Sequence, residues 1–415
     1  MKTEQVDVLV IGAGPAGTVA ASIIHQAGYK VKIVEKQRFP RFVIGESLLP
    51  RSMEALEEAG FIEAINARGF QRKYGAKFVK KDAVCDFTFE EQFTKGWTWT
   101  WQVTRADFDK TLADTCEKMG IAIAYETTVT DIRFNGQESV TTVTDAQGRR
   151  QEIHARFIVD GSGYGRVIPR LFNLEKPSNL QPRRALFAHT VDVRRSMADQ
   201  PNRITAVVHQ PGVWIWIIPF STGVTSLGFV GDPSFFAQYA GTPEQQYRAL
   251  LEAEPYTRER FRDVELVFEP RVLESWSATT DKFYGEGFVL TGNVTEFLDP
   301  IFSSGVTLAC VSSQTAARLV VRKLQGQEVD WEKEYMEPAM QGVNTFRSYV
   351  MAWYEGTLDT IFFNPAPNPL VKQQICSVLA GYVWDMDNPF VSNHHTALKR
   401  LARAIELTEK IKEGN

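Results

Sequence analysis

Three glycines close to the amino terminus have the spacing of a dinucleotide-binding turn. Gly12, Gly14 and Gly17 fit the pattern G-x-G-x-x-G, with an apolar run before them and a helical pattern after them. Gly12 permits a tight turn, Gly14 lets the backbone approach a pyrophosphate, and Gly17 allows close packing of helix on strand. Pro15 and Ala16 begin the helix, whose N–H groups and partial positive charge would attract the phosphates.

An acidic residue at the end of the second apolar run adds a ribose contact to the predicted dinucleotide site. Glu35 ends the second apolar run, at the distance from Gly17 where a ribose-binding acid is found. Its carboxylate would accept hydrogen bonds from both ribose hydroxyls and would repel a 2′-phosphate, which disfavours NADP. The neighbouring Lys36 is expected to line the same cofactor site.

Three further motifs resemble FAD-dependent aromatic monooxygenases and so favour FAD over NAD. Arg105 begins an R-x-x-F-D stretch, and in that family an arginine here lies near the isoalloxazine ring. Asp160 and Gly161 begin a D-G-S-G turn that resembles the family's D-[AG]-[ST]-G. Gly292 and Asn293 stand where the family has Gly-Asp near the ribityl chain, with a neutral partner in place of the acid.

A strand motif with two tryptophans resembles the flavin-dependent halogenases. Trp214 and Trp216 fit that family's W-x-W-x-I-P sequence, and on a strand of period two both rings project from one face. The resemblance implies that they border the passage between flavin and substrate. Two large rings could also simply build a core.

A second motif of the same family is F-x-x-P-x-x-S-x-G, which begins at Phe297 and includes Pro300 and Gly305. Ser304, Gly305 and Val306 come at the start of a predicted helix, where N–H groups lack intrahelical partners and the dipole favours an anion. Ser304 and Gly305 could therefore hold a halide, while Pro300, Gly305 and Val306 would contact FAD. The same amides could instead contact the flavin or water.

A lysine is the residue that we expect to carry the oxidant. Lys73 lies in R-K-Y-G-A, downstream of a stretch that contains Glu46 and Ser47, and both stretches resemble halogenases of phenols, pyrroles or carrier-bound aromatics. The resemblance implies that Lys73 captures hypohalous acid formed from halide, reduced FAD and oxygen. Ser47 is expected on the strap that contacts the flavin. The alternative is an exposed lysine on a strand.

One position departs from the tryptophan halogenases. They carry a glutamate two residues after the proline of the second motif, and this sequence has Phe302 there. We therefore expect Phe302 to border the substrate passage and the substrate to be a phenol-like ring, which already donates electrons strongly.

The elements that would position these residues predict an α/β fold. Strands are expected at 6–11, 31–34 and 153–159, with helices at 15–27 and 306–324 and long β-runs between 184 and 268. We predict a Rossmann-type FAD-binding domain with an inserted antiparallel β-sheet substrate domain and a helical C-terminal region. The expected FAD-binding domain covers residues 1–180, with an interleaved substrate-side segment at about 45–100, and returns at 286–328. The sheet domain covers 181–285 and the helical region 329–415.

The composition excludes several classes of protein. Lys plus Arg number 46 and Asp plus Glu 50, a net charge of −4, which gives no basic footprint for nucleic acid. The four cysteines lie far apart, which favours reduced thiols over disulfides or a metal site. We find no signal peptide and no membrane span, and expect a cytoplasmic protein.

The sequence therefore predicts an FAD-dependent halogenase that acts on a small aromatic compound, free or attached to a carrier protein. One dinucleotide motif is present, which predicts a separate flavin reductase. Three alternatives remain: a reductase of prenyl chains similar to geranylgeranyl reductase, an aromatic hydroxylase, and a flavin-binding protein without catalysis.

Overall fold

The computed structural model describes residues 2–136, 138–178 and 180–413. Its first sheet is the one that the glycine turn predicts. Strand β1 (Lys2–Ile11) leads into helix α1 (Pro15–Gln26) and then into β2 (Val31–Val34), which pairs with β1 in parallel. Strand β10 (Arg150–Asp160) pairs in parallel with the other edge of β1. The carboxyl ends of β1 and β10 therefore lie side by side, at the edge of the sheet where ligands bind in open α/β folds.

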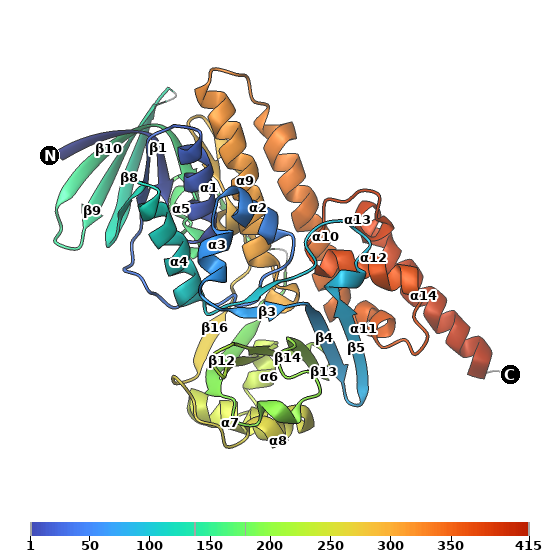
Figure 1. Cartoon of the computed structure of the whole chain (residues 1–415). Coiled ribbons are helices and arrows are strands. Elements are labelled where there is room, and N and C mark those ends of the chain that lie inside the picture. Colours follow the sequence, from blue (N-terminus) through green and yellow to red (C-terminus); the bar gives the residue numbers. More distant parts are fainter. Residues whose placement is uncertain (1, 137, 179, 414–415) are drawn as a thin grey trace.

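Two antiparallel strands extend the first sheet, and helices cover it. Strands β8 (Thr127–Asn135) and β9 (Glu138–Asp145) form a hairpin whose second strand pairs with β10. Helix α4 (Arg105–Lys118) and helix α9 (Ser304–Leu324) pack beside α1, as Figure 1 shows. Every residue of α9 from Val306 to Val311 is buried, and its packing on α1 places this part of the helix beside the glycine turn.

The second sheet combines two distant parts of the chain. Seven strands lie in the order β16-β12-β15-β14-β13-β4-β5. Five of them come from the middle of the sequence, and two from the hairpin β4–β5. Their bounds are β4 Gly75–Lys80, β5 Ala83–Thr88, β12 Arg184–Val191, β13 Thr205–Gln210, β14 Val213–Pro219, β15 Val224–Gly231 and β16 Arg271–Glu274. Strand β4 pairs in parallel with β13, so the early hairpin completes the later sheet.

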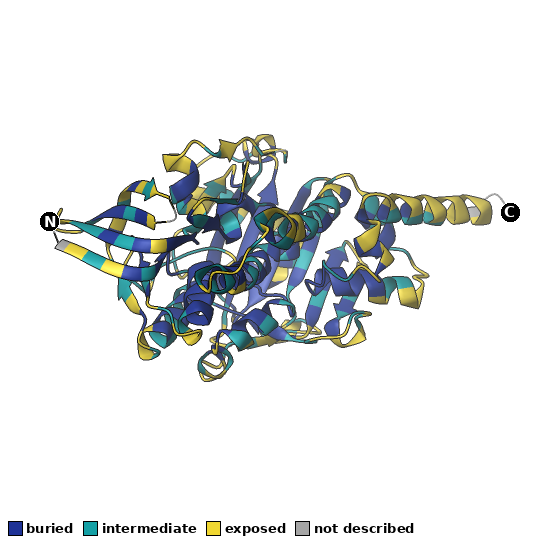
Figure 2. Cartoon of the chain, turned by 90° about the horizontal axis from the view of Figure 1, so that it is seen from above, coloured by how far each residue is buried: buried dark blue, intermediate teal, exposed yellow. Residues whose placement is uncertain are grey.

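The last part of the chain is helical and packs against the hairpin β4–β5 (Figure 1). Its main helices share aromatic and aliphatic faces that join the core cluster of the second sheet. They are α10 (Glu337–Tyr354), α11 (Thr357–Phe362), α12 (Pro369–Leu379), α13 (Pro389–Ser392) and α14 (His394–Glu413). Figure 2 shows the far half of α14 as an exposed helix that projects from the body of the molecule.

The predicted fold class and the main elements are confirmed. The strands expected at 31–34 and 153–159 and the helices at 15–27 and 306–324 are present with small changes of boundary. None of the described helices is long and apolar enough to cross a membrane. The proposed domain limits stay predictions.

Candidate active site

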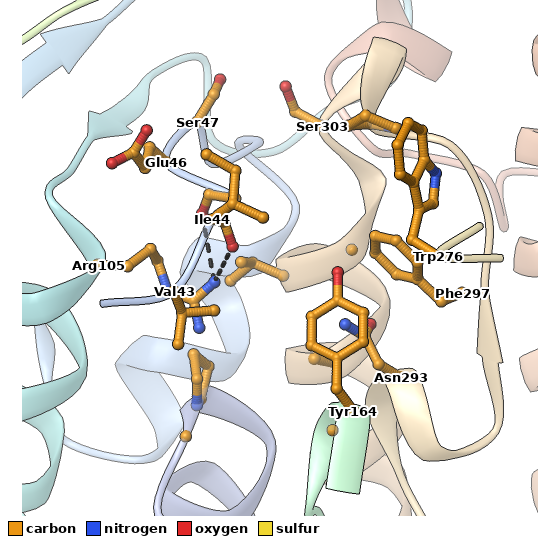
Figure 3. A pocket seen from close by; sticks show the side chains of 18 of the residues that line it. Val43, Ile44, Glu46, Ser47, Arg105, Tyr164, Trp276, Asn293, Phe297 and Ser303 are labelled. Atoms are coloured by element: carbon orange, nitrogen blue, oxygen red, sulfur yellow. Dashed lines mark hydrogen bonds between the residues drawn. The ribbon is translucent and has the colours of Figure 1, made fainter. Parts of the chain in front are cut away.

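A single large pocket runs from the glycine turn to the second sheet. Its empty volume is about 1620 Å³, which includes the part that opens to solvent. Figure 3 shows Arg105 and Glu46 on one side of the pocket, Tyr164 and Phe297 on the other, and the hydroxyl groups of Ser47 and Ser303 at its upper edge.

Most of the predicted residues border this pocket. Those in its wall are Gly12, Gly14, Pro15, Ala16, Glu35, Lys36, Ser47, Arg105, Gly161, Trp214, Trp216, Asn293, Pro300, Gly305 and Val306. The predicted residues outside the wall are Gly17, Lys73, Asp160, Gly292, Phe302 and Ser304.

The three glycines of the turn have the geometry that a pyrophosphate requires. A Cβ at Gly12 would lie 2.7 Å from the carbonyl oxygen of Gly161, and one at Gly17 would lie 1.8 Å from the carbonyl oxygen of Gly12. A Cβ at Gly14 would meet no atom closer than Arg41 Nη2 at 3.4 Å. The space in front of Gly14 is therefore open, beside the amino terminus of α1, and the residues fit the diphosphate of FAD.

A buried cluster of charges lies next to this open space. Arg105 donates from Nε and Nη2 to the two carboxylate oxygens of Asp109, at 2.8 and 3.0 Å, and from Nη1 to the carbonyl oxygens of Ile44 and Gly45. Arg41 Nη1 lies 3.1 Å from Asp109. Arg41 also lines the pocket. Arg41 could not be predicted from the sequence, because a single arginine in a loop carries no motif.

The two acidic residues predicted near the cofactor serve different structural purposes. Glu35 lines the pocket while its carboxylate accepts N–H groups from Ala13 and Gln37, both at 2.9 Å. Asp160 is fully buried behind the turn, where its oxygens accept the N–H groups of Ser162 and Ile168. Asp160 therefore shapes the turn from behind and does not face the pocket.

Both tryptophans of β14 lie on the pocket wall. Their ring centroids are 6.1 Å apart. Trp214 Nε1 donates to the hydroxyl of Tyr354 at 3.1 Å, and Trp216 Nε1 donates to Ser226 Oγ at 3.0 Å. Because each indole N–H has a partner, both rings are held in fixed positions.

The start of α9 forms another part of the wall. Ser303 has φ +55°, a left-handed backbone conformation, and it caps the helix without a side-chain hydrogen bond. The first N–H groups of an α-helix have no intrahelical acceptor. Ser303 and Gly305 border the pocket, whereas the Ser304 side chain is buried away from it, so only the backbone of Ser304 is suited to an anion.

Lys73 is buried behind the pocket wall. It ends β3 (Gln71–Lys73), and its Nζ donates to Ser47 Oγ and to the carbonyl oxygen of Leu48, both at 2.8 Å. Burial, with a smaller contribution from the charge of Arg203, lowers the pKa of the Lys73 ammonium to about 7. Lys73 is thus connected to the pocket through Ser47, whose hydroxyl forms part of the wall.

Glu46 lines the pocket and is paired with a histidine that does not line it. Glu46 Oε1 lies 2.7 Å from His189 Nε2, and both side chains are buried. Glu46 Oε2 has no hydrogen-bond partner among the residues that the structure describes. A carboxylate oxygen of this wall is therefore available to a bound molecule.

Phe302 is not where we expected it. Its ring packs edge-on against Tyr349 and Trp353 of α10, inside the aromatic core of the helical region. Asp299, Pro300 and Ile301 of the same motif do line the pocket, and Asp299 is a buried acid to which no sequence motif assigns a role. The 3-10 helix η5 (Pro300–Phe302) turns the chain between Asp299 and Phe302, which a motif alone does not reveal.

The described residues contain no group of His, Cys, Asp and Glu that could hold a metal ion. The pocket itself brings together a buried arginine cluster, several carboxylates, aromatic walls and a helix amino terminus.

Comparisons with known proteins agree with this picture. A family model described as an FAD binding domain matches residues 5–228. The 1H-pyrrole-2-carbonyl-(peptidyl-carrier protein) brominase of Pseudoalteromonas luteoviolacea is 26% identical over 393 residues, which cover 92% of this chain and 93% of that protein. The tryptophan 2-halogenase of Chondromyces crocatus is 30% identical over 352 residues, 81% of this chain and 65% of that protein.

Among solved structures, a flavoprotein/dehydrogenase from Cytophaga hutchinsonii is 59% identical. It superposes with a TM-score of 0.96, over 98% of this chain and all of the other.

Proposed function

Because the chain belongs to the FAD-binding domain family and, within it, to the flavin-dependent halogenases, we propose that it halogenates an electron-rich aromatic compound. The observation that carries the proposal is the continuity of the pocket, which joins the glycine turn, both tryptophans and the start of α9 in one wall. FAD and an aromatic substrate can therefore lie in one enclosure, along with an anion.

When bound and reduced, FAD supplies the activation of oxygen that converts a halide into hypohalous acid, so the chain's own residues supply binding and confinement. The N–H groups at Ser304 and Gly305 would hold the halide, because the amino end of a long helix attracts anions without a cationic side chain. The left-handed backbone of Ser303 supports this assignment, since it turns the chain so that the first turn of α9 borders the pocket.

Lys73 would receive the hypohalous acid and present it to the ring. An amine accepts an electrophilic halogen only when it is neutral, and the lowered pKa gives Lys73 a large neutral fraction near pH 7. Ser47 would have to release Lys73 Nζ, or pass the oxidant along its hydroxyl, for Lys73 to act.

The substrate is proposed to be a phenol-like ring, free or attached to a carrier protein. The relative that acts on a carrier-bound pyrrole supports the second form. A separate reductase would supply reduced flavin, since one dinucleotide turn is present in the sequence.

The deciding experiment supplies the purified protein with FAD, a flavin reductase, NADH, oxygen and bromide, together with 4-methylphenol and tryptophan in equal amounts. Mass spectrometry should detect bromophenol product and little bromotryptophan. Reactions without bromide or without the protein are the controls. Bromination of tryptophan with the phenol untouched would contradict the proposed substrate class and leave the proposed activity standing.

An oxidoreductase that needs no halide is the second candidate. Two observations favour it: the similar protein from Cytophaga hutchinsonii is described as a flavoprotein/dehydrogenase, and Lys73 lies outside the pocket wall. In the same assay this activity would give an oxidised or hydroxylated product in the absence of bromide. Product that forms equally with and without halide would replace the first proposal by the second.

A further inference from the structure

Asp299 is a buried carboxyl group in the wall of the pocket. Its side chain is 4% exposed, and it immediately precedes Pro300 and η5. One oxygen, Oδ1, accepts the N–H of Ile301 at 3.1 Å and so caps this short turn. The pocket around it also includes the indole rings of Trp214 and Trp276, so the carboxyl group borders a largely aromatic space.

The other oxygen is held by a side chain from the helical region. The hydroxyl of Tyr354, the last residue of α10, donates to Asp299 Oδ2 at 3.0 Å and accepts from Trp214 Nε1 at 3.1 Å. Arg183 lies over the Tyr354 ring, 3.8 Å from its centroid. Three separate parts of the chain therefore converge to fix the orientation of one carboxylate.

This carboxylate has acceptor capacity that the described residues do not use. An ionised carboxylate offers about four lone-pair positions, and two neutral donors occupy two of them. Among the described residues no lysine or arginine forms an ion pair with it, and the positive charge of Arg183 acts on it from a greater distance. A buried negative charge with few donors is costly unless a ligand supplies another hydrogen bond.

We propose, on the basis of the proposed function, that Asp299 recognises the substrate by accepting a hydrogen bond from an aromatic hydroxyl group. Tyr354 and Trp214 are positioning residues that hold the carboxylate for this contact. The tryptophan walls contact the ring, and the hydrogen bond to the carboxylate increases the electron density of the ring. The preferred substrate class is therefore a phenol with a free hydroxyl group, and the corresponding methyl ether binds more weakly.

The test uses calorimetric titration of the FAD-loaded protein with 4-methylphenol and, separately, with 4-methylanisole, its methyl ether. The parent protein should bind the phenol about tenfold more tightly, as expected for a hydrogen bond to a charged group. Asp299→Asn should bind both ligands within about twofold of each other. Glu296→Gln, which removes a buried carboxylate of the same segment outside the pocket wall, should keep the tenfold preference.

Two further variants distinguish the role of Asp299 from that of Tyr354. Tyr354→Phe removes the hydroxyl that orients the carboxylate and should lower the preference for the phenol to about threefold. Tyr349→Phe, whose buried hydroxyl has no partner among the described residues, should keep the full preference. Loss of the preference in Tyr354→Phe with Asp299→Asn unaffected would give the role to Tyr354 and overturn the proposal. These two tyrosine variants also keep the question decidable if Asp299→Asn fails to fold.

Two other results would also overturn the proposal that Asp299 recognises an aromatic hydroxyl group. If Asp299→Asn lost its FAD, the carboxylate would be a cofactor contact, and if the parent bound the ether as tightly as the phenol, no such recognition would exist. The outcome is distinct from that of the bromination assay. Preferential binding of the phenol without bromination would leave this inference standing and remove the proposed function.

Discussion

Gly14 is the residue whose lack of a side chain matters most for cofactor binding. Open space in front of its Cα, with Arg41 at the far side, is what a diphosphate would fill. Gly14→Val should therefore abolish FAD binding while the protein stays folded. Absorbance of the bound flavin in purified protein measures this, with Ala146→Val in an exposed turn as the control. A Gly14→Val protein that remains yellow would contradict the cofactor assignment.

Lys73 combines deep burial with a lowered pKa, and its role can be separated from flavin chemistry. Lys73→Ala should keep FAD and consume reduced flavin at the parent rate, but form less than about 1% of the halogenated product, about 3 kcal/mol in barrier. The parent's product formation should rise between pH 6 and pH 8, as the amine becomes neutral. Lys77→Ala, a nearby buried lysine outside the pocket, is the matched control. Near-parent halogenation by Lys73→Ala would show that another group transfers the halogen.

Asp299 should also make the free energy of unfolding depend on pH. Burial raises the pKa of the Asp299 carboxyl in the folded state to about 6, from 3.8 for an unperturbed aspartate, so between these values the folded state binds more protons than the unfolded state. The contribution of Asp299 to stability is therefore greatest below pH 3.8 and falls as the pH rises through 6.

Asp299→Asn has no such proton to lose. Its free energy of unfolding, relative to the parent, should increase by up to about 3 kcal/mol from pH 4 to pH 7. Denaturant unfolding at several pH values measures the difference. A difference that stays constant with pH would mean that Asp299 is not buried as described.

At the scale of elements, strand β15 presents a glycine to the ring of Trp216. Gly228 is paired with Trp216 across the sheet, and a Cβ there would lie 2.3 Å from Trp216 Cζ2 and 2.6 Å from Phe187 Cβ. Gly228→Ala should therefore displace the indole ring and cost about 1–3 kcal/mol of stability through overpacking. At Gly231 on the same strand, an added Cβ would have its nearest contact with a methyl of Val213 at 3.0 Å, so Gly231→Ala should cost less. Equal melting temperatures of the two variants would argue against a tightly packed Trp216.

Local patterns explain why some elements could be predicted and others could not. The strand at 31–34 and the glycine turn follow from residues that are adjacent in sequence, and the structure reproduces them. The joining of β4 to β13 depends on a pairing across more than a hundred residues, for which a strand pattern names no partner. The same limit applies to Asp299 and Phe302: the motif identifies the loop, but the turn of η5 decides which side chain faces the pocket.

At the scale of the whole molecule, the helical region contributes to the site through α10, while much of α14 does not. Leu398 and Ala402 are buried against the neighbouring helices, whereas Leu407 and Ile411 are exposed. Deletion of residues 404–415 should leave FAD binding unchanged and the melting temperature within a few degrees. Leu398→Ala should cost about 2–5 kcal/mol because it leaves a cavity in the core. A large loss of stability on deletion would show that the exposed part of α14 is covered by another surface in solution.

The pairing of the hairpin β4–β5 with a later strand determines when the second sheet can form during translation. Strand β4 of this hairpin pairs with β13, which leaves the ribosome on the order of ten seconds later. Phe78 and Phe87 pack against Phe362 of the helical region, which is made later still. Until β13 is made, the free edge of β4 can pair with other chains. Efficient production should therefore depend on chaperones that act on nascent chains, and a gene fragment that ends before residue 205 should yield insoluble protein even though it encodes the whole glycine turn.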